Sequence, residues 1–90
     1  MIVMDSPRYA VFRGTNITTA HCLSTLPGKE GTNELLTFGA SIGMRATWLQ
    51  YPGTYREHFD LMGWKCRAAI KAGAVEDGDL LAVTLREKRG

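Results

Sequence analysis

His58 and Asp60 stand two positions apart, directly before a segment with the pattern of a helix. An imidazole that bonds to a carboxylate is oriented for proton transfer, so these two residues are the candidate catalytic pair of the chain. The alternative is structural: Asp60 would cap the helix, and His58 would bond to a loop carbonyl. A helix N-terminus also favours anions, and Lys65, about one turn further on, would face an anion bound there.

Three more polar residues complete the candidate ligand-binding set: Asp5, His21 and Gln50. For His21 the alternative is a partly buried histidine with a satisfied ring, and for Asp5 it is the cap of a turn. Two imidazoles and two carboxylates suit zinc, manganese or iron, so a metal site is conceivable from His21, His58, Asp60 and Asp5, of which the first three are the candidate ligands. No H-x-x-x-H or H-x-H spacing accompanies them, so a divalent metal is the weaker interpretation.

Several other kinds of site are excluded by the absence of their motifs. The chain has no Gly-rich dinucleotide loop, no P-loop and no nucleophile elbow. Cys22 and Cys66 form no C-x-x-C pair, which argues against a zinc ribbon, and Cys66 lies on an apolar helix face. With no signal peptide and no run of about 20 apolar residues, we expect a cytoplasmic protein, no membrane association and reduced thiols.

The composition is that of one globular domain. Ninety residues leave room for a single modest core, and 44% hydrophobic with 22% charged residues argues against disorder. A formal net charge of +2 is too small to indicate a nucleic-acid partner by itself. Residues 86–90 carry Arg86, Lys88 and Arg89, and we interpret this basic tail as a solvated end, with nucleic-acid binding as the weaker alternative.

Hydrophobic periodicity predicts the elements that position these residues. They are a strand over residues 1–4, a hairpin or an ordered excursion over 9–12 and 17–23, a helix over 33–42, a strand over 45–50, a helix over 61–72 and a strand from residue 74. Thr32 is predicted to cap the first helix and Gly43 to end it. The apolar stripe of that helix follows the i, i+3, i+4, i+7 spacing through Leu35, Phe38, Gly39 and Ile42.

The last fifteen residues fit two patterns. Leu81, Val83 and Leu85 alternate as in a strand, whereas a short final helix capped by Asp79 is the alternative. The structure of residues 76–90 is therefore left open.

The order strand, helix, strand, helix, strand is typical of a small α/β fold. Such a β-α-β-α-β chain forms a parallel sheet in two or three layers, here with an extra hairpin and a C-terminal strand. Ligands bind at the carboxyl ends of parallel strands. Asp5 and Gln50 end strands, and His21, His58 and Asp60 lie in connections to that edge, so we expect all five to converge.

The same polar residues belong to a longer pattern. It consists of Asp5-Ser6-Pro7, His21-Cys22-Leu23, Glu34 to Gly39, Ile42-Gly43-Met44, Trp48-Leu49-Gln50, His58-Phe59-Asp60, Lys65-Cys66-Arg67 and Gly73-Ala74. In this order the motifs resemble a family of short prokaryotic and phage proteins known as a domain of unknown function, with D-x-P, His-Leu, W-x-Q, H-Y-D and K-R motifs. The resemblance runs from residue 1 to about 75. Cys22 and Cys66 interrupt two motifs, and Phe59 replaces a tyrosine.

These observations lead to three functional hypotheses. The first is a ligand-binding module for a small anionic molecule such as a nucleotide or phosphate ester, and the phage relatives suggest sequestration of a host signal. The second is a small phosphoester hydrolase that is metal-dependent or uses His58 and Asp60, so whether the chain is an enzyme is open. The third is a protein or nucleic-acid interaction module. A homodimer through an exposed sheet edge is compatible with each of them.

Overall fold

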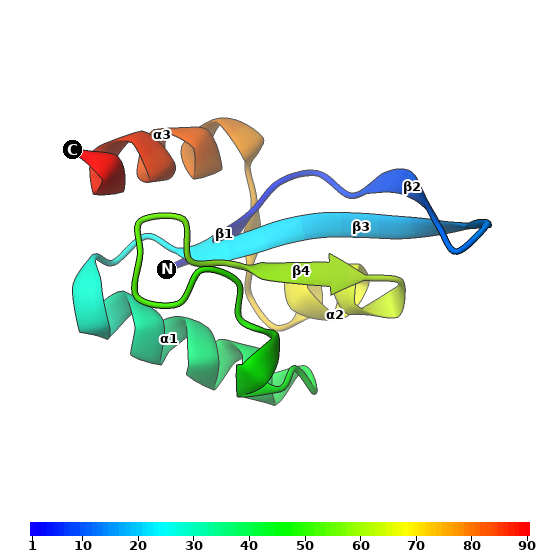
Figure 1. Cartoon of the computed structure of the whole chain (residues 1–90), viewed down its shortest axis with the longest axis horizontal. Coiled ribbons are helices and arrows are strands. Elements are labelled where there is room, and N and C mark those ends of the chain that lie inside the picture. The colour runs from blue at the N-terminus through cyan, green and yellow to red at the C-terminus, as the bar shows by residue number, and fades with distance from the viewer.

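The computed structural model describes residues 1–90 and combines a five-stranded sheet with three α-helices (Figure 1). The strands are β1 (Ile2–Met4), β2 (Arg8–Phe12), β3 (Thr15–Ser24), β4 (Phe59–Met62) and β5 (Val75–Glu76). The helices are α1 (Gly28–Ser41), α2 (Trp64–Lys71) and α3 (Gly78–Arg89), together with the 3₁₀-helix η1 (Ala46–Trp48). No helix has the combined length and hydropathy needed to cross a bilayer.

β3 is the centre of the sheet, because it pairs antiparallel with three other strands. β4 pairs along one of its edges, where Ala20 lies opposite Leu61. β1 and then β2 pair along the other edge, one after the other. β5 extends the sheet beyond β1 in a parallel pairing. The sheet order is therefore β4–β3–β1–β5, with β2 continuing the line of β1.

The step from β1 to β2 contains one extra residue. Met4 lies opposite Cys22 and Arg8 lies opposite Thr19, so residues 5–7 face only two residues of β3. A bulge of this kind disrupts the ladder of backbone hydrogen bonds. The backbone N–H of His21 donates to Oδ1 of Asp5 at 2.6 Å. A side chain therefore supplies an acceptor at the point where the ladder is interrupted.

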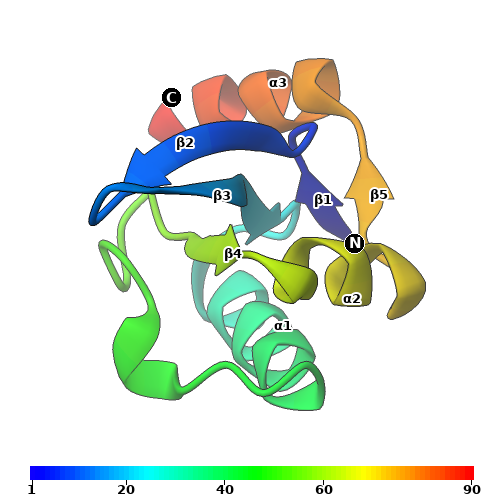
Figure 2. The same cartoon turned by 90° about the vertical axis from the view of Figure 1, so that its right-hand side faces the viewer.

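The helices cover both faces of the sheet, which makes three layers (Figure 2). α1 and α2 pack on one face and α3 packs on the other. Strand alternation directs Met4 and Cys22 into the larger core on the α1 side, and Val3 and Leu23 into the smaller core under α3. Because both faces are covered here, β1 and the end of β3 are buried at consecutive positions.

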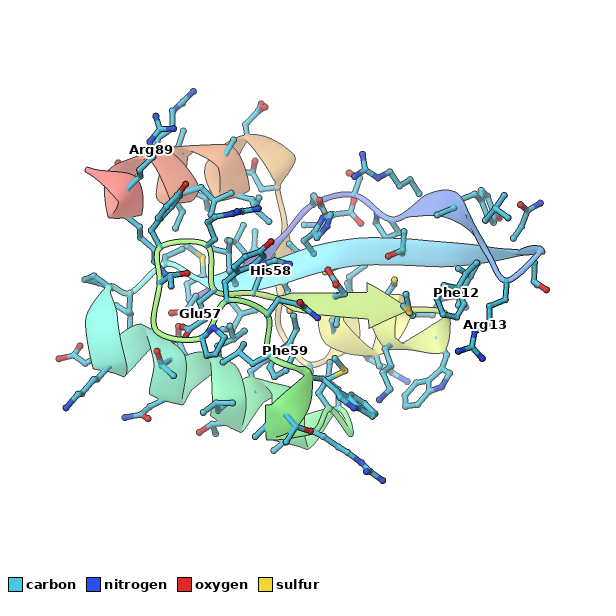
Figure 3. All side chains as sticks on the ribbon, viewed as in Figure 1. Phe12, Arg13, Glu57, His58, Phe59 and Arg89 are labelled. Carbon is cyan, nitrogen blue, oxygen red and sulfur yellow. The ribbon has the colours of Figure 1, made fainter.

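The hairpin expected from the sequence is formed by β2 and the first half of β3. Arg13 and Gly14 make its two-residue turn, with φ values of 51° and 78° as in a type I′ turn. Every residue of β2 is exposed, so this hairpin extends away from the helices. In Figure 3 Arg13 stands at its tip, at the opposite end of the molecule from Arg89.

The α/β class is correct, but the predicted parallel sheet is wrong. Three of the four strand pairings are antiparallel, and only β1 and β5 run parallel. The strand expected over residues 45–50 is instead the 3₁₀-helix η1 followed by a single bridge between Gln50 and His58. Its residues 46–48 are exposed, so no buried face holds them in the sheet.

The helix predicted over residues 61–72 starts later, because its first residues form β4. Phe59 and Leu61 are buried and alternate with Asp60 and Met62, which is the period of a strand. Gly63, with φ 60°, separates β4 from α2. Asp60 therefore does not cap a helix, and that structural interpretation of the residue is wrong.

The other two helices also differ from the predicted bounds. α1 begins at Gly28, so Thr32 lies inside it and is not the cap, whereas Gly43 follows its end with φ 80° as expected. The final helix alternative is correct in kind, but its cap is Asp77, whose Oδ1 accepts from Leu80 N at 3.0 Å. The pattern could not separate the strand from the helix, because positions 81 and 85 share a face in either structure.

Replacing Gly39 by alanine tests the packing of α1 against β4. A Cβ there would lie 2.5 Å from Cε2 of Phe59, whose side chain is almost fully buried. Overpacking costs about 1–3 kcal/mol, and the higher helix propensity of alanine offsets about 1 kcal/mol. We expect a net loss of up to about 2 kcal/mol in the free energy of unfolding, measured by urea denaturation. Thr37→Ala, at an exposed position of α1, is the control and should not destabilise; equal stability of both variants would contradict this packing.

Candidate functional site

Two cross-strand pairings bring the candidate residues together. His21 of β3 lies directly opposite Asp60 of β4, and Gln50 forms an isolated bridge with His58. The side chain of His21 shares the face of Leu23, which is the face that α3 covers. Figure 3 shows His58 on this side of the sheet, whereas its neighbour Phe59 points toward α1. The predicted convergence therefore occurs, through antiparallel pairing instead of parallel strand ends.

Asp5 holds His21 through two hydrogen bonds. Its Oδ2 lies 2.8 Å from Nδ1 of His21, and its Oδ1 accepts from the backbone N–H of the same residue at 2.6 Å. The imidazole is therefore fixed by a carboxylate on the side facing away from Asp60. This is the orientation in which a carboxylate positions a histidine for acid–base work or for binding a metal.

The predicted pair of His58 and Asp60 is present, with a longer separation. Nε2 of His58 lies 3.3 Å from Oδ1 of Asp60, and Nε2 of His21 lies 3.7 Å from the same oxygen. The two imidazole rings are 5.4 Å apart between centroids and meet edge to face. Nδ1 of His58 lies 2.6 Å from the carbonyl oxygen of Arg56, so a loop carbonyl is also bonded, as the structural alternative expected.

The loop of residues 51–57 is anchored by a buried glutamate that the sequence analysis did not single out. Glu57 is only 4% exposed, and its carboxylate accepts from Thr32 Oγ1 at 2.8 Å and from the backbone N–H of Gly53 at 2.9 Å. Pro52 and Gly53 form a turn that the backbone N–H of Thr54 closes by donating to the carbonyl oxygen of Tyr51, and Tyr51 has φ 50°, a left-handed conformation. The loop is thereby held against α1, and it presents His58 and its neighbours to α3.

A cleft of about 650 Å³ opens between this loop, the sheet and α3. It contains both histidines and Asp60 together with a group of aromatic and basic residues from the loop and from α3. The lining residues are His21, Leu23, Gln50, Tyr51, Tyr55, Arg56, His58, Asp60, Leu81, Leu85, Arg86 and Arg89. Four of the six predicted ligand-binding residues line the cleft. Asp5 does not line it but bonds to His21, which does.

The basic C-terminus is not a free tail. Arg86 and Arg89 belong to α3 and line the cleft, while Arg56 reaches it from the loop with its guanidinium 4.1 Å from the ring centre of Tyr51. Both arginines are exposed, as the interpretation of residues 86–90 as a solvated end expected, but they stand on a helix at the cleft. The spacing of Leu81, Leu85 and Arg89 at i, i+4 and i+8 places these three residues on one face of a helix, but the same spacing also shares a face in a strand.

Lys65 is the predicted site residue that lies outside the cleft. Its ammonium group donates to the carbonyl oxygen of Gly43 at 2.9 Å and lies 4.7 Å from the ring centre of Trp48. Lys65 lines a second hollow, of about 480 Å³, to which Gln50 and Asp60 also contribute. Lys65 therefore ties α2 to the segment after α1 and lies outside the cleft that contains the two histidines.

The two thiols are structural. Cys22 and Cys66 are buried and unpaired, as expected for Cys66 from its place on an apolar helix face. Burial raises the pKa of the Cys22 thiol to about 12 and also raises the pKa of Cys66. Because Cys22 faces the α1 side of β3, it takes no part in the cleft even though it follows His21.

Comparison of the chain with protein-family models, with curated proteins and with solved structures finds no match. The resemblance to the domain of unknown function therefore stays a prediction, and the functional argument depends on the geometry of the cleft.

Replacing Glu57 by alanine tests whether the buried carboxylate organises the loop. The change leaves Thr32 Oγ1 and the N–H of Gly53 without their acceptor, which costs about 1–3 kcal/mol of the free energy of unfolding. Relative to the wild-type protein, we expect amide hydrogen exchange in Glu57→Ala to become faster over residues 51–58 and to change less over β1 and β3. Glu30→Ala, an exposed acid in the first turn of α1, is the control; unchanged exchange in the loop of Glu57→Ala would contradict the anchoring role.

Proposed function

We propose that the chain binds a small phosphorylated molecule, such as a nucleotide or another phosphate ester, in the cleft beneath α3. The observation that carries this proposal is the charge of the cleft lining. Three guanidinium groups, from Arg56, Arg86 and Arg89, surround it, and Asp60 is the only carboxylate among the lining residues. Since the whole chain has a formal net charge of only +2, positive charge is concentrated at this site.

Arginine is suited to this ligand for geometric reasons. Its planar guanidinium donates parallel hydrogen bonds to two oxygens of one phosphate group, and it keeps its charge at every physiological pH. Arg86 and Arg89 also stand in the last turn of α3, where positive side chains favourably meet the negative end of the helix dipole. The helix dipole explains why arginines stand in the last turn of α3, but it does not explain why they line the cleft. It does not apply to Arg56 at all, because Arg56 belongs to a loop.

The size and the aromatic lining of the cleft support a ligand with a planar part. Clefts that bind small molecules enclose roughly 300–1,000 Å³, and about 650 Å³ falls in this range. Tyr55 is 40% exposed and lines the cleft, so its ring offers a surface to a nucleobase or a sugar. Tyr51 is occupied by the guanidinium of Arg56 on its ring and holds that charge at the cleft.

Hydrolysis of the bound ester is the second candidate function. It is favoured by the hydrogen bond between Asp5 and Nδ1 of His21, which orients the other ring nitrogen toward Asp60 at the floor of the cleft. Steady release of inorganic phosphate or of p-nitrophenol from phosphate mono- and diesters, abolished in His21→Ala, would establish turnover. Ligand binding without release would leave the binding module as the function.

Removing the two helix arginines together tests the proposed ligand class. The variant Arg86→Ala/Arg89→Ala loses two charge-assisted contacts, each contributing about 1.5–3 kcal/mol, so affinity should fall at least about 100-fold. Isothermal titration of the metal-free protein with a panel of nucleoside mono-, di- and triphosphates measures it.

Arg13→Ala is the control, because it removes an arginine at the distant tip of the hairpin, one positive charge against the two of the double variant. It should leave the affinity within about twofold of the wild-type value at fixed salt. Equal losses in both variants would indicate a nonspecific effect of net charge, and no binding of any phosphate ester by the wild-type protein would refute the proposal.

A further inference from the structure

The two imidazoles of the cleft are held in the same tautomer. Nδ1 of His21 faces a carboxylate oxygen of Asp5 at 2.8 Å, and Nδ1 of His58 faces the carbonyl oxygen of Arg56 at 2.6 Å. Both partners are hydrogen-bond acceptors, so each Nδ1 carries the hydrogen that the bond needs. In a neutral imidazole the other nitrogen then carries a free lone pair. Both Nε2 atoms can therefore coordinate a metal ion.

Both lone pairs converge on the same carboxylate oxygen. Nε2 of His58 lies 3.3 Å and Nε2 of His21 lies 3.7 Å from Oδ1 of Asp60. The ligand atoms of these three residues all lie within 4.8 Å of one another. With both rings neutral, no member of this group can donate a hydrogen bond to another. Three acceptors that face one another in this way are satisfied by a cation bound between them or by a hydrogen on one Nε2 of a protonated ring.

The two printed separations, 3.3 Å and 3.7 Å from Oδ1 of Asp60, are close to those that a metal ion imposes on its ligands. Nitrogen and oxygen ligands bound at about 2.0–2.2 Å to a tetrahedral ion lie roughly 3.3–3.6 Å from each other. The bonds at Nδ1 are also the outer contacts typical of metal-binding histidines, whose second nitrogen donates to a carboxylate or a backbone carbonyl. Asp5 is thus a positioning residue, and its second bond to the backbone of His21 keeps it in place.

We propose that Nε2 of His21, Nε2 of His58 and the carboxylate of Asp60 bind one divalent transition-metal ion, with a further coordination position open to the cleft. Two imidazoles and one carboxylate suit zinc, manganese or ferrous iron. The side chains of His21 and Asp60 are 39% and 41% exposed, so the ion is accessible to a ligand. Three protein ligands with an open position are typical of metal sites that bind or activate a substrate.

The metal site does not depend on the nature of the ligand that the arginines attract. If the proposed phosphate ester binds, one of its oxygens or a water molecule would take the open position, since the site lies at the floor of the same cleft. A metal-bound water in that place would be the nucleophile for ester hydrolysis.

Titration with a metal ion alone is the test. The full chain, stripped with a chelator and dialysed, is titrated calorimetrically with Zn²⁺ and with Mn²⁺, and one ion per chain is expected. His21→Ala and Asp60→Asn should each lower the Zn²⁺ affinity by at least about 100-fold, and Asp5→Asn by about 10–100-fold. Asp79→Asn removes a carboxylate that does not line the cleft and should bind as tightly as the wild-type protein.

Nitrogen NMR of the imidazoles gives a second readout that does not depend on variants. In the stripped protein both rings should show a hydrogen on Nδ1, and Zn²⁺ should shift both Nε2 signals while the Nδ1 hydrogens are retained. Rings that are doubly protonated at neutral pH, together with no metal binding, would show that protons and not a metal balance Asp60, and would overturn the proposal. Zn²⁺ binding that survives in His21→Ala and Asp60→Asn would overturn it as well. Because phosphate-ester binding is measured on the stripped protein, failure of either proposal can be told from failure of the other.

Discussion

The pairing of β3 on both of its edges is the constraint on which the rest of the structure depends. Its ten residues hold β1 and β2 on one edge and β4 on the other, although β4 lies about 40 positions away in the sequence. Since side chains alternate along a strand, this register decides which residues enter the core and which enter the cleft. A shift of β4 by one residue would send Asp60 into the apolar core and Phe59 toward α3.

The two faces of β3 have different physical tasks. On the α1 side, Ala20 and Cys22 are buried in a dry core with Phe59 and Leu61. On the α3 side, Leu23 joins a smaller core, and His21 two residues earlier stands where that core gives way to the cleft. The polar groups of the site are therefore carried by strands that are rigid because their other face is packed. Such support is what keeps a site within the small tolerances that ligand and metal binding require.

The two halves of β3 differ in how well they are buried. The half of β3 that carries His21 lies between two layers of helices, whereas the other half pairs with β2 in a hairpin that is exposed throughout. Tyr9 and Val11 of that hairpin are 82% and 74% exposed, and β2 has no strand on its outer edge. Local opening is expected to concentrate in such segments, because few buried apolar contacts oppose it. The cleft lies at the opposite end of the sheet from this segment.

Local patterns in the sequence were sufficient for the features that depend on near neighbours. The stripe of Leu35, Gly39 and Ile42 on α1, the glycine that ends this helix, and the hairpin around Gly14 were all predicted from spacing and residue type. The sequence also indicated which residue types form the site, because a histidine and a carboxylate two positions apart can be recognised before the fold is known. Five of the six predicted ligand-binding residues come together at the cleft or directly behind it.

Only the tertiary structure decided how these residues meet. A strand and a helix place positions i and i+4 on one face alike, so residues 81 and 85 could not reveal that α3 brings Arg86 and Arg89 over the histidines. The short apolar segment at Phe59 to Met62 likewise fits either structure until β3 supplies its hydrogen bonds. The sequence by itself determined which chemical groups were available and which local turns the chain takes. Strand partners distant in the chain determined that Asp5, His21, His58 and Asp60 share one site, because pairing and burial energies act between residues that no local pattern connects.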